Sequence, residues 1–211
     1  MTGRTWTAKM KGHDIKVTSE KLAQWRDFYL SDPELVSRIS ELMWFDMYVL
    51  EAEFGVSPHD IIKSVLDLEA GEKSQGVKPA TPFGKLPLKG LWHKHFFSAH
   101  FLVNNIILGH GKNGLAKLID EVFDAANSPI VTHEMIAELA RRATRDPVEQ
   151  RDTAGKLTGE WIIFTKQGGK NYYISANTHA AGDQFIYDRI TQYCVRDFPQ
   201  LTDWLKALQS P

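Results

Sequence analysis

Residues 160–175 read EWIIFTKQGGKNYYIS, two runs rich in β-branched and aromatic side chains that flank a short polar segment. The segment Gln167-Gly168-Gly169-Lys170 lies between them, and a pair of glycines favours the tight turn that joins antiparallel strands. The stretch therefore predicts a β-hairpin. Because an isolated hairpin is only marginally stable in water, we expect this one to join further strands or to pack on helices.

Helical patterns with capping signals precede the hairpin. Ser31-Asp32-Pro33 provides a helix start and Gly55 a stop, with a broad apolar face between them. Ser57-Pro58 repeats the start signal for a helix that runs to Gly71, and an earlier helix is expected over 19–30. These three helices form the N-terminal part of the expected fold.

The remaining elements lie around the hairpin. Residues 91–109 favour a short extended start followed by a helix from about 98 to 108, and their pattern also admits strands. Further helices are expected over 115–126 and 132–144, from Asp146-Pro147, over 183–195 and through Leu208 at the end.

These elements predict an α+β protein, with a helical N-terminal part followed by a mixed part. In the mixed part a small antiparallel sheet, built on the hairpin near 160–178, packs on helices. We expect a helical subdomain over 1–72, a connector loop over 73–90 broken by glycine and proline, and an α+β subdomain over 91–211. One continuous domain over 1–211 is the alternative.

Composition narrows the class of protein. The chain has 211 residues, 43% hydrophobic and 24% charged, which excludes a disordered tail, a collagen-like fibre and a coiled-coil rod. A single cysteine, Cys194, excludes an intramolecular disulfide and fits a reducing compartment. No apolar run approaches the roughly 20 residues that span a bilayer, and the N-terminus lacks the apolar core of a secretory signal. We expect a soluble, cytoplasmic protein with no membrane partner.

Charge is distributed unevenly along the chain. Residues 31–72 hold ten acidic side chains against only Arg38 and Lys63, whereas residues 73–119 hold seven lysines and no acid. Four of the eight histidines also lie in the basic block. Such a block suits a polyanion or a phosphate group. The alternative is that the acidic helices fold against the basic block and cancel its charge.

No common catalytic motif is present. The chain lacks a P-loop and the patterns G-x-G-x-x-G, H-E-x-x-H, G-x-S-x-G and C-x-x-C. This disfavours Walker-type NTPases, dinucleotide-binding Rossmann proteins, classical zinc proteases and α/β-hydrolases.

The densest chemical segment is LWHKHFFSAH, residues 91–100. Imidazoles titrate near neutral pH, so His93 or His95 could act as general base, with His100 or His179 as general acid. Lys94 could neutralise charge in a phosphoryl transition state, and the aromatic side chains in this segment could stack a nucleobase. The alternative is that His93 and His95 lie beside packed aromatics.

A second cluster lies at 175–183, where His179 follows the end of the second hairpin strand. If the strand continues, Tyr173 shares a face with Ser175, Asn177 and His179, and Lys166 and Arg189 could reach the same phosphate. Alternatively, Asp183 caps its helix and His179 is a loop residue. Asn104 interrupts an apolar run, and a buried amide without hydrogen bonds costs about 1–3 kcal/mol, so we expect it either to bond to the backbone in the core or to position a ligand beside His100.

Three functions follow from these patterns. The first is a metal-independent, toxin-like endoribonuclease without a cofactor, which acts on RNA or another phosphate-bearing ligand. The second is a non-catalytic interaction protein with an acidic helical face and a basic face, bound to a neutralising or regulatory partner. The third is a metal-dependent hydrolase with His93, His95 and His100 as ligands and Asp183 or His179 as the fourth. A catalytic protein should gather its histidines in one pocket, whereas a binder should expose apolar side chains on the N-terminal helices.

Overall fold

The computed structural model describes residues 3–72, 79–96, 102–123, 132–153, 160–178 and 181–209, without the side chains of 102–105, 151–153 and 209. Its helices and antiparallel strands confirm the α+β class. Internal contacts divide the chain into two units, Met1–Lys73 with Pro79–Phe96 and Glu160–Pro211, and Ser74–Lys78 with Phe97–Gly159. The units do not follow the connector expected at 73–90, because the strand after it pairs with the hairpin.

The first unit contains both sheets and most of the helices. Its elements in chain order are β1 (Thr5–Lys9), β2 (Asp14–Thr18), α1 (Ser19–Tyr29), α2 (Pro33–Ser37), α3 (Glu41–Phe54), α4 (Pro58–Glu69), β3 (Thr81–Pro82), β4 (Trp92–Phe96), β5 (Glu160–Gln167), β6 (Lys170–Asn177), α9 (Asp183–Tyr193) and α10 (Leu201–Gln209).

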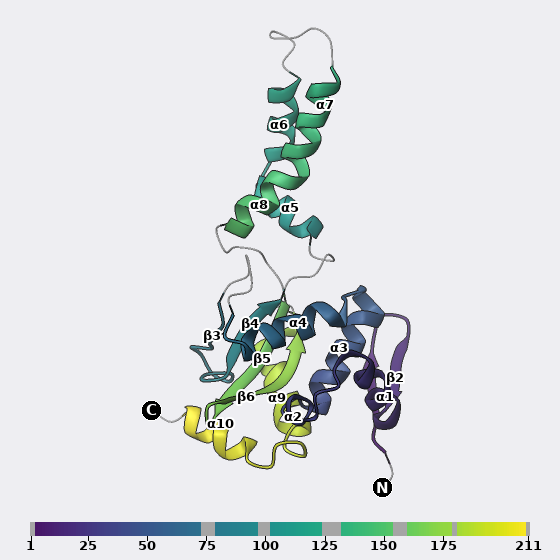
Figure 1. Cartoon of the computed structure of the whole chain (residues 1–211), viewed down its shortest axis with the longest axis vertical. Coiled ribbons are helices and arrows are strands. Elements are labelled where there is room, and N and C mark those ends of the chain that lie inside the picture. The colour runs from purple at the N-terminus through teal and green to yellow at the C-terminus, as the bar shows by residue number, and fades with distance from the viewer. Residues whose placement is uncertain are drawn as a thin grey trace. The chain divides into compact units, whose positions relative to one another are not determined.

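The larger sheet is antiparallel throughout, in the order β3-β4-β5-β6 (Figure 1). The predicted hairpin is confirmed as β5 and β6, closed by the pair Gln167–Lys170. Gly168 and Gly169 both have positive φ, 56° and 78°, which a side chain would disfavour. The expected extended start of 91–109 is β4, which pairs with β5 and places His95 opposite Trp161.

A second hairpin, β1 and β2, lies at the N-terminus and was not expected from the sequence. Trp6 pairs with Val17 and Ala8 with Ile15, so these four side chains share one face while Thr5, Thr7 and Lys9 are exposed. Only five residues alternate in each strand, and such a short pattern is weak evidence for a strand. The region 1–72 therefore contains strands as well as helices.

The helix expected between Ser31 and Gly55 is interrupted. It forms α2 and α3, with residues 38–40 between them, and Ile39 forms an isolated parallel β-bridge with Tyr173 of β6. Tyr173 N donates to Arg38 O at 2.8 Å, and Ser40 N donates to Tyr173 O at 2.9 Å. Ser40 then caps α3 by accepting a hydrogen bond from Met43 N, 3.0 Å long. Tertiary pairing thus replaces one turn of helix.

A β-bulge divides β6 into two parts that face different neighbours. The pairing shifts between Ile163–Ser175 and Phe164–Tyr173, which leaves Ile174 as an extra residue. The Tyr173 hydroxyl donates to Glu69 of α4 at 2.7 Å, whereas the Ser175 hydroxyl donates to Asp46 of α3 at 2.6 Å. The expectation that Tyr173 and Ser175 share a face is therefore wrong, because a bulge re-aims one side chain.

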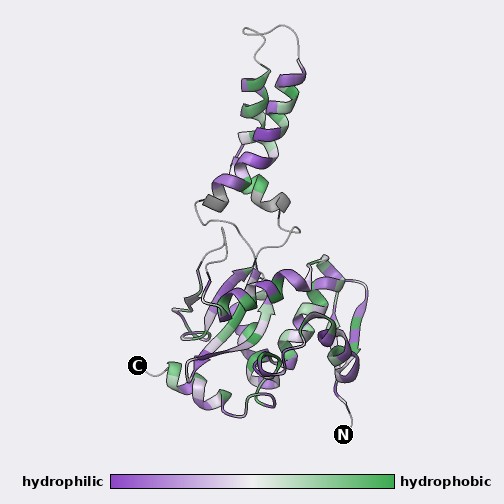
Figure 2. Cartoon of the chain, viewed as in Figure 1, coloured by the Kyte–Doolittle hydropathy of each residue, from purple (hydrophilic) through white to green (hydrophobic). Residues whose placement is uncertain are grey.

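The core of the first unit lies among α3, α4 and the sheet. Leu42, Met43 and Met47 of α3 and Ile162 and Ile163 of β5 are fully buried, and Figure 2 shows hydrophobic residues along both elements. Cys194 is also fully buried, as expected.

The second unit is helical where it is described. It contains α5 (Leu102–His110), α6 (Gly114–Val122), α7 (His133–Ala140), the π-helical turn η2 (Arg141–Arg145) and α8 (Asp146–Thr153). Ion pairs join Arg142 to Glu121 at 2.7 Å and Arg141 to Asp146 at 2.6 Å. Over the described ranges of the whole chain, no helix has the length and apolar character needed to cross a membrane.

Candidate ligand-binding site

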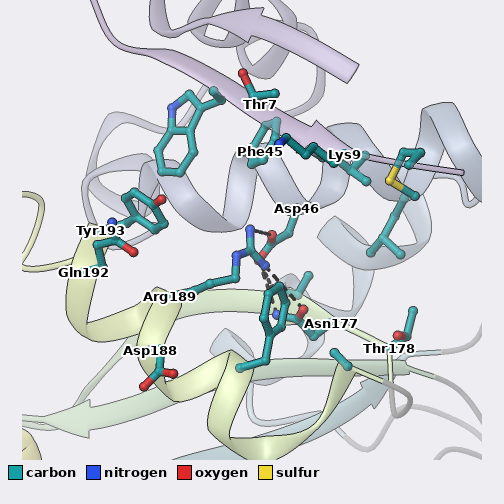
Figure 3. A pocket seen from close by; sticks show the side chains of 18 of the residues that line it. Thr7, Lys9, Phe45, Asp46, Asn177, Thr178, Asp188, Arg189, Gln192 and Tyr193 are labelled. Carbon is teal, nitrogen blue, oxygen red and sulfur yellow. Dashed lines mark hydrogen bonds and ion pairs between the residues drawn. The ribbon is translucent and has the colours of Figure 1, made fainter. Parts of the chain in front are cut away.

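A cavity of about 800 Å³ opens in the first unit (Figure 3). Its walls are β1, α3, the end of β6 with the residues that follow it, and α9. The volume falls in the range of roughly 300–1,000 Å³ that is typical of ligand pockets.

The floor of the cavity holds an ion pair between Asp46 of α3 and Arg189 of α9. Arg189 Nη2 donates to Asp46 Oδ1 at 2.6 Å, and Arg189 Nη1 donates to Asn177 Oδ1 at 3.4 Å. Asp46 Oδ2 also accepts from the Ser175 hydroxyl at 2.6 Å and from Ala176 N at 3.1 Å. Figure 3 shows the Arg189 guanidinium directed toward Asp46 and Asn177 in the centre of the pocket. The guanidinium is thereby held in one orientation.

Burial sets the electrostatics of this pair. The Asp46 side chain is 4% exposed and that of Arg189 is 18% exposed. Burial raises the pKa of Asp46, while Arg189 and the hydrogen bond from Ser175 act in the opposite direction. Arg189 is the more exposed residue of the pair, so a ligand in the cavity can reach its guanidinium group.

Aromatic side chains and a second arginine form the wall beside β1. Trp6 stacks on Phe45 with ring centroids 5.1 Å apart and contacts Tyr193 at 5.2 Å. The Arg4 guanidinium lies 4.7 Å from the Trp6 ring and 5.4 Å from the Tyr193 ring. Its Nη1 is buried and has no hydrogen-bond acceptor among the residues that the structure describes. A buried donor without an acceptor points to a ligand or a water at this place.

The structure places His93 and His95 elsewhere, on β4. Their ring centroids are 5.6 Å apart, and the Trp161 ring lies 5.4 Å from His93 and 6.4 Å from His95. His93 Nε2 lies 3.3 Å from the Thr81 hydroxyl, and His95 is 6% exposed. The two histidines are therefore close to each other, but neither lines the cavity.

The expected phosphate-binding lysines also lie apart from the cavity. Lys94 is buried, which lowers its pKa, and the Asp67 carboxylate acts in the opposite direction. Lys166 is exposed, with its Nζ 3.7 Å from the centre of the Trp92 ring. These contacts give both lysines packing partners.

Tyr173 and Arg189 complete the set of expected residues on the sheet and α9. Tyr173 is fully buried, and burial together with its hydrogen bond to Glu69 raises its pKa. Arg189 lines the cavity and was expected to bind phosphate.

His100 and His179 lie outside the described residues, as does the side chain of Asn104, whose backbone belongs to α5. Within the described ranges, no three His, Cys, Asp or Glu side chains are arranged to hold a metal ion.

Asp46, Arg4 and Trp6 were missed as site residues. One signal for Asp46 is present in the sequence, because it is the acidic residue inside the apolar run LMWFDMYVL, 42–50. A carboxylate in a buried stretch needs a partner or it carries a large desolvation cost. Arg4 and Trp6 had no such signal, since their place in the site depends on the unexpected N-terminal hairpin.

Comparison with protein-family models, with curated proteins and with solved structures finds no match to this chain.

Proposed function

We propose that this protein is a binding protein whose cavity receives an anionic group of a partner. The observation that carries the proposal is the orientation of Arg189 by Asp46 and Asn177. A guanidinium has five N–H donors, and the described residues accept two of those of Arg189. The remaining donors, together with Arg4 Nη1, suit a carboxylate or a phosphate group.

Binding fits the lining better than catalysis does. No histidine or cysteine lines the cavity among the residues that the structure describes. Asp46 already accepts hydrogen bonds from the Arg189, Ser175 and Ala176 donors, and its side chain is only 4% exposed, so a substrate proton has little access to its remaining lone pair. A general base needs a free lone pair within reach of the proton it removes.

Exposed apolar side chains on the N-terminal helices also fit a binding protein. Phe28 of α1 is 77% exposed, Leu66 of α4 is 46% exposed and Phe54 of α3 is 38% exposed. Exposed aromatic and aliphatic side chains of this kind are typical of protein contact surfaces when they form a patch.

The proposal is tested by calorimetric titration of the whole chain with inorganic diphosphate, glutarate and the peptide acetyl-Val-Glu-Val-Glu-Val-Glu-amide. Arg4→Gln removes a cavity cation, and Arg196→Gln is the matched control on an exposed residue outside the lining. We expect at least one probe to bind the parent chain and the control, and to bind Arg4→Gln at least about tenfold more weakly, as loss of a charge-assisted hydrogen bond implies. Absence of binding by all three probes, or equal affinity in both variants, overturns the proposal.

A second candidate function is metal-independent cleavage of RNA. The contact between the His93 and His95 rings at 5.6 Å favours it, because acid–base catalysis needs two titratable groups near one phosphate. Trp161 beside both rings offers a surface on which a base could stack.

This candidate is tested by incubating the chain with mixed RNA in the presence and absence of EDTA. Cleavage that survives EDTA and is lost in His93→Ala/His95→Ala supports it. Cleavage that EDTA abolishes indicates a metal-dependent hydrolase instead, and intact RNA in every sample excludes both.

A further inference from the structure

We infer that the partner is an acidic peptide segment, which binds in extended form as a third strand along the free edge of β1. The inference rests on the proposed function, because it names the partner that carries the anionic group into the cavity.

The hydrogen-bond pattern of the N-terminal hairpin identifies the free edge. Met10 N donates to His13 O at 2.9 Å, and Ser19 N donates to Arg4 O at 2.8 Å. In an antiparallel ladder the bonded pairs alternate with non-bonded ones, so Arg4, Trp6, Ala8 and Met10 direct their backbone groups toward β2. The N–H and C=O groups of Thr5, Thr7 and Lys9 therefore point to the opposite side.

That side has no protein partner in the described part of the chain. β1 pairs only with β2 there, and the backbone groups of Thr5, Thr7 and Lys9 make no other hydrogen bond with described residues. Their groups recur every second residue, roughly 7 Å apart. An unpaired row of this kind is a template on which an extended chain can add a strand.

The free edge borders the cavity. Every residue from Arg4 to Met10 lines it, although alternate side chains of a strand point to opposite faces. Because all seven consecutive residues line the cavity, it must border the backbone edge of the strand as well as the side chains on one of its faces. Thr178 of the segment after β6, with Asp188 and Gln192 of α9, lines the cavity as well.

The positive charge of residues lining the cavity favours a peptide with acidic side chains. The ion pair with Asp46 compensates part of the charge of Arg189, but Arg4, which precedes β1, and Lys9 of β1 have no ion-pair partner among described residues. Against these cations, the lining contains one further acid, the exposed Asp188. Alternate side chains of an added strand would point toward the arginines, so acidic residues at every second position fit the site.

The protein test compares two proline substitutions in one cross-strand pair. Thr7 and Lys16 face each other as a non-bonded pair, so their N–H groups point to the two opposite outer edges of the hairpin. Proline removes the N–H and is tolerated at an edge. We expect Thr7→Pro to weaken binding of acetyl-Val-Glu-Val-Glu-Val-Glu-amide at least about tenfold, and Lys16→Pro to leave its affinity unchanged. Circular dichroism of both variants establishes that they fold.

The peptide test uses the unmodified protein and so does not depend on the folding of a variant. Two versions of the peptide carry backbone N-methyl groups, one on the valine amides and one on the glutamate amides. In an added strand only one of these sets faces β1, so one version should bind at least about tenfold more weakly than the other.

The outcomes separate this inference from the proposed function. If the peptide binds through Arg4 but is insensitive to Thr7→Pro and to the position of methylation, the added strand is wrong and the anion site stands. If no probe binds, the proposed function fails as well. If the chain dimerises and Thr7→Pro abolishes the dimer without an effect on peptide binding, the occupant of the edge is a second copy, and the peptide inference is overturned.

Discussion

Within the first unit, the outer backbone edge of β6 is hydrogen-bonded to other parts of the chain, whereas that of β1 has no hydrogen-bond partner among the described residues. Along β6, Tyr173 exchanges two backbone hydrogen bonds with the 38–40 segment, Arg38 Nη1 donates to Asn171 O at 2.8 Å, and Asp46 accepts from Ala176 N at 3.1 Å. Along β1, the backbone groups of Thr5, Thr7 and Lys9 form no hydrogen bond with a described residue. One edge is closed by chain segments and charged side chains, and the other borders a cavity.

The comparison shows that one residue, Asp46, both covers part of the edge of β6 and forms part of the cavity floor. Asp46 covers a backbone N–H of β6 with one carboxylate oxygen and orients Arg189 with the other. An edge strand needs such protection because unpaired backbone groups invite association with other chains. The packing of the described residues leaves the edge of β1 uncovered. We therefore attribute the exposure of this edge to function.

The largest expected effect comes from removing the shared residue. Asp46→Ala leaves Arg189 and the backbone N–H of Ala176 without their acceptor in a buried place. We expect the free energy of unfolding in urea to fall by about 3–5 kcal/mol, as for other broken buried ion pairs. The control is Asp188→Ala, an exposed acid of the same lining, which should change it by less than about 0.5 kcal/mol. Equal effects of the two substitutions would contradict the role given to Asp46.

A smaller effect is expected from opening the other half of the β6 edge. Arg38 donates to Asn171 O and also pairs with Glu34 at 2.9 Å and with Glu69. Arg38→Met keeps most of the side-chain length but removes these bonds, which should cost about 1.5–3 kcal/mol in urea unfolding. If Arg38→Met lowers the free energy of unfolding by less than an ordinary surface substitution does, the pairing of residues 38–40 alone closes the edge.

The same cluster predicts a dependence of stability on pH. Hydrogen bonds from Arg38 and, to a lesser extent, from Lys170 lower the pKa of Glu34 from 4.5 to about 2. The pKa of Glu69 is also lowered, because hydrogen bonds from Arg38, Tyr173 and Asn171 outweigh the opposite effect of its burial. A carboxylate with a lower pKa in the folded chain stabilises the fold above about pH 4.5 and loses this contribution as the pH falls toward 2. The melting temperature should drop more steeply over this range in the parent chain than in Arg38→Met. Parallel curves would refute the assignment.

The smallest effect concerns the open edge itself. Thr7→Pro removes an N–H that has no described partner, whereas Ala8→Pro removes one that the ladder uses. We expect Ala8→Pro to be less stable than Thr7→Pro by about 1 kcal/mol or more in urea unfolding. The reverse order would mean that the register assigned to the free edge is wrong.

Much of the fold was predictable from local patterns. The hairpin 160–175 combined a glycine turn with β-branched and aromatic flanks, and its strands and turn are confirmed. The starts of α2 at Pro33 and α4 at Pro58 follow their capping and proline signals. In contrast, the interruption at 38–40 and the bulge at Ile174 had no local signal, because both depend on how distant strands and helices meet.

The candidate site was predictable only in part. Arg189 was expected to bind an anion and does line the cavity, whereas Lys94 and Tyr173 lie buried against α4 residues instead. Alternation along a strand accounts for the contact between the His93 and His95 rings on β4. Spacing could not show that neither residue reaches the cavity.

The sequence by itself determined the α+β class, most helix starts and the central hairpin, because turn chemistry, capping and hydrophobic period act over a few neighbouring residues. Only the tertiary structure decided which edge of which sheet is closed and which charged side chains meet. Asp46 and Arg189 are 143 residues apart in the chain, and their bond exists only because α3, β6 and α9 pack together. Contacts of this length depend on the packing of whole elements, which no short stretch of sequence encodes.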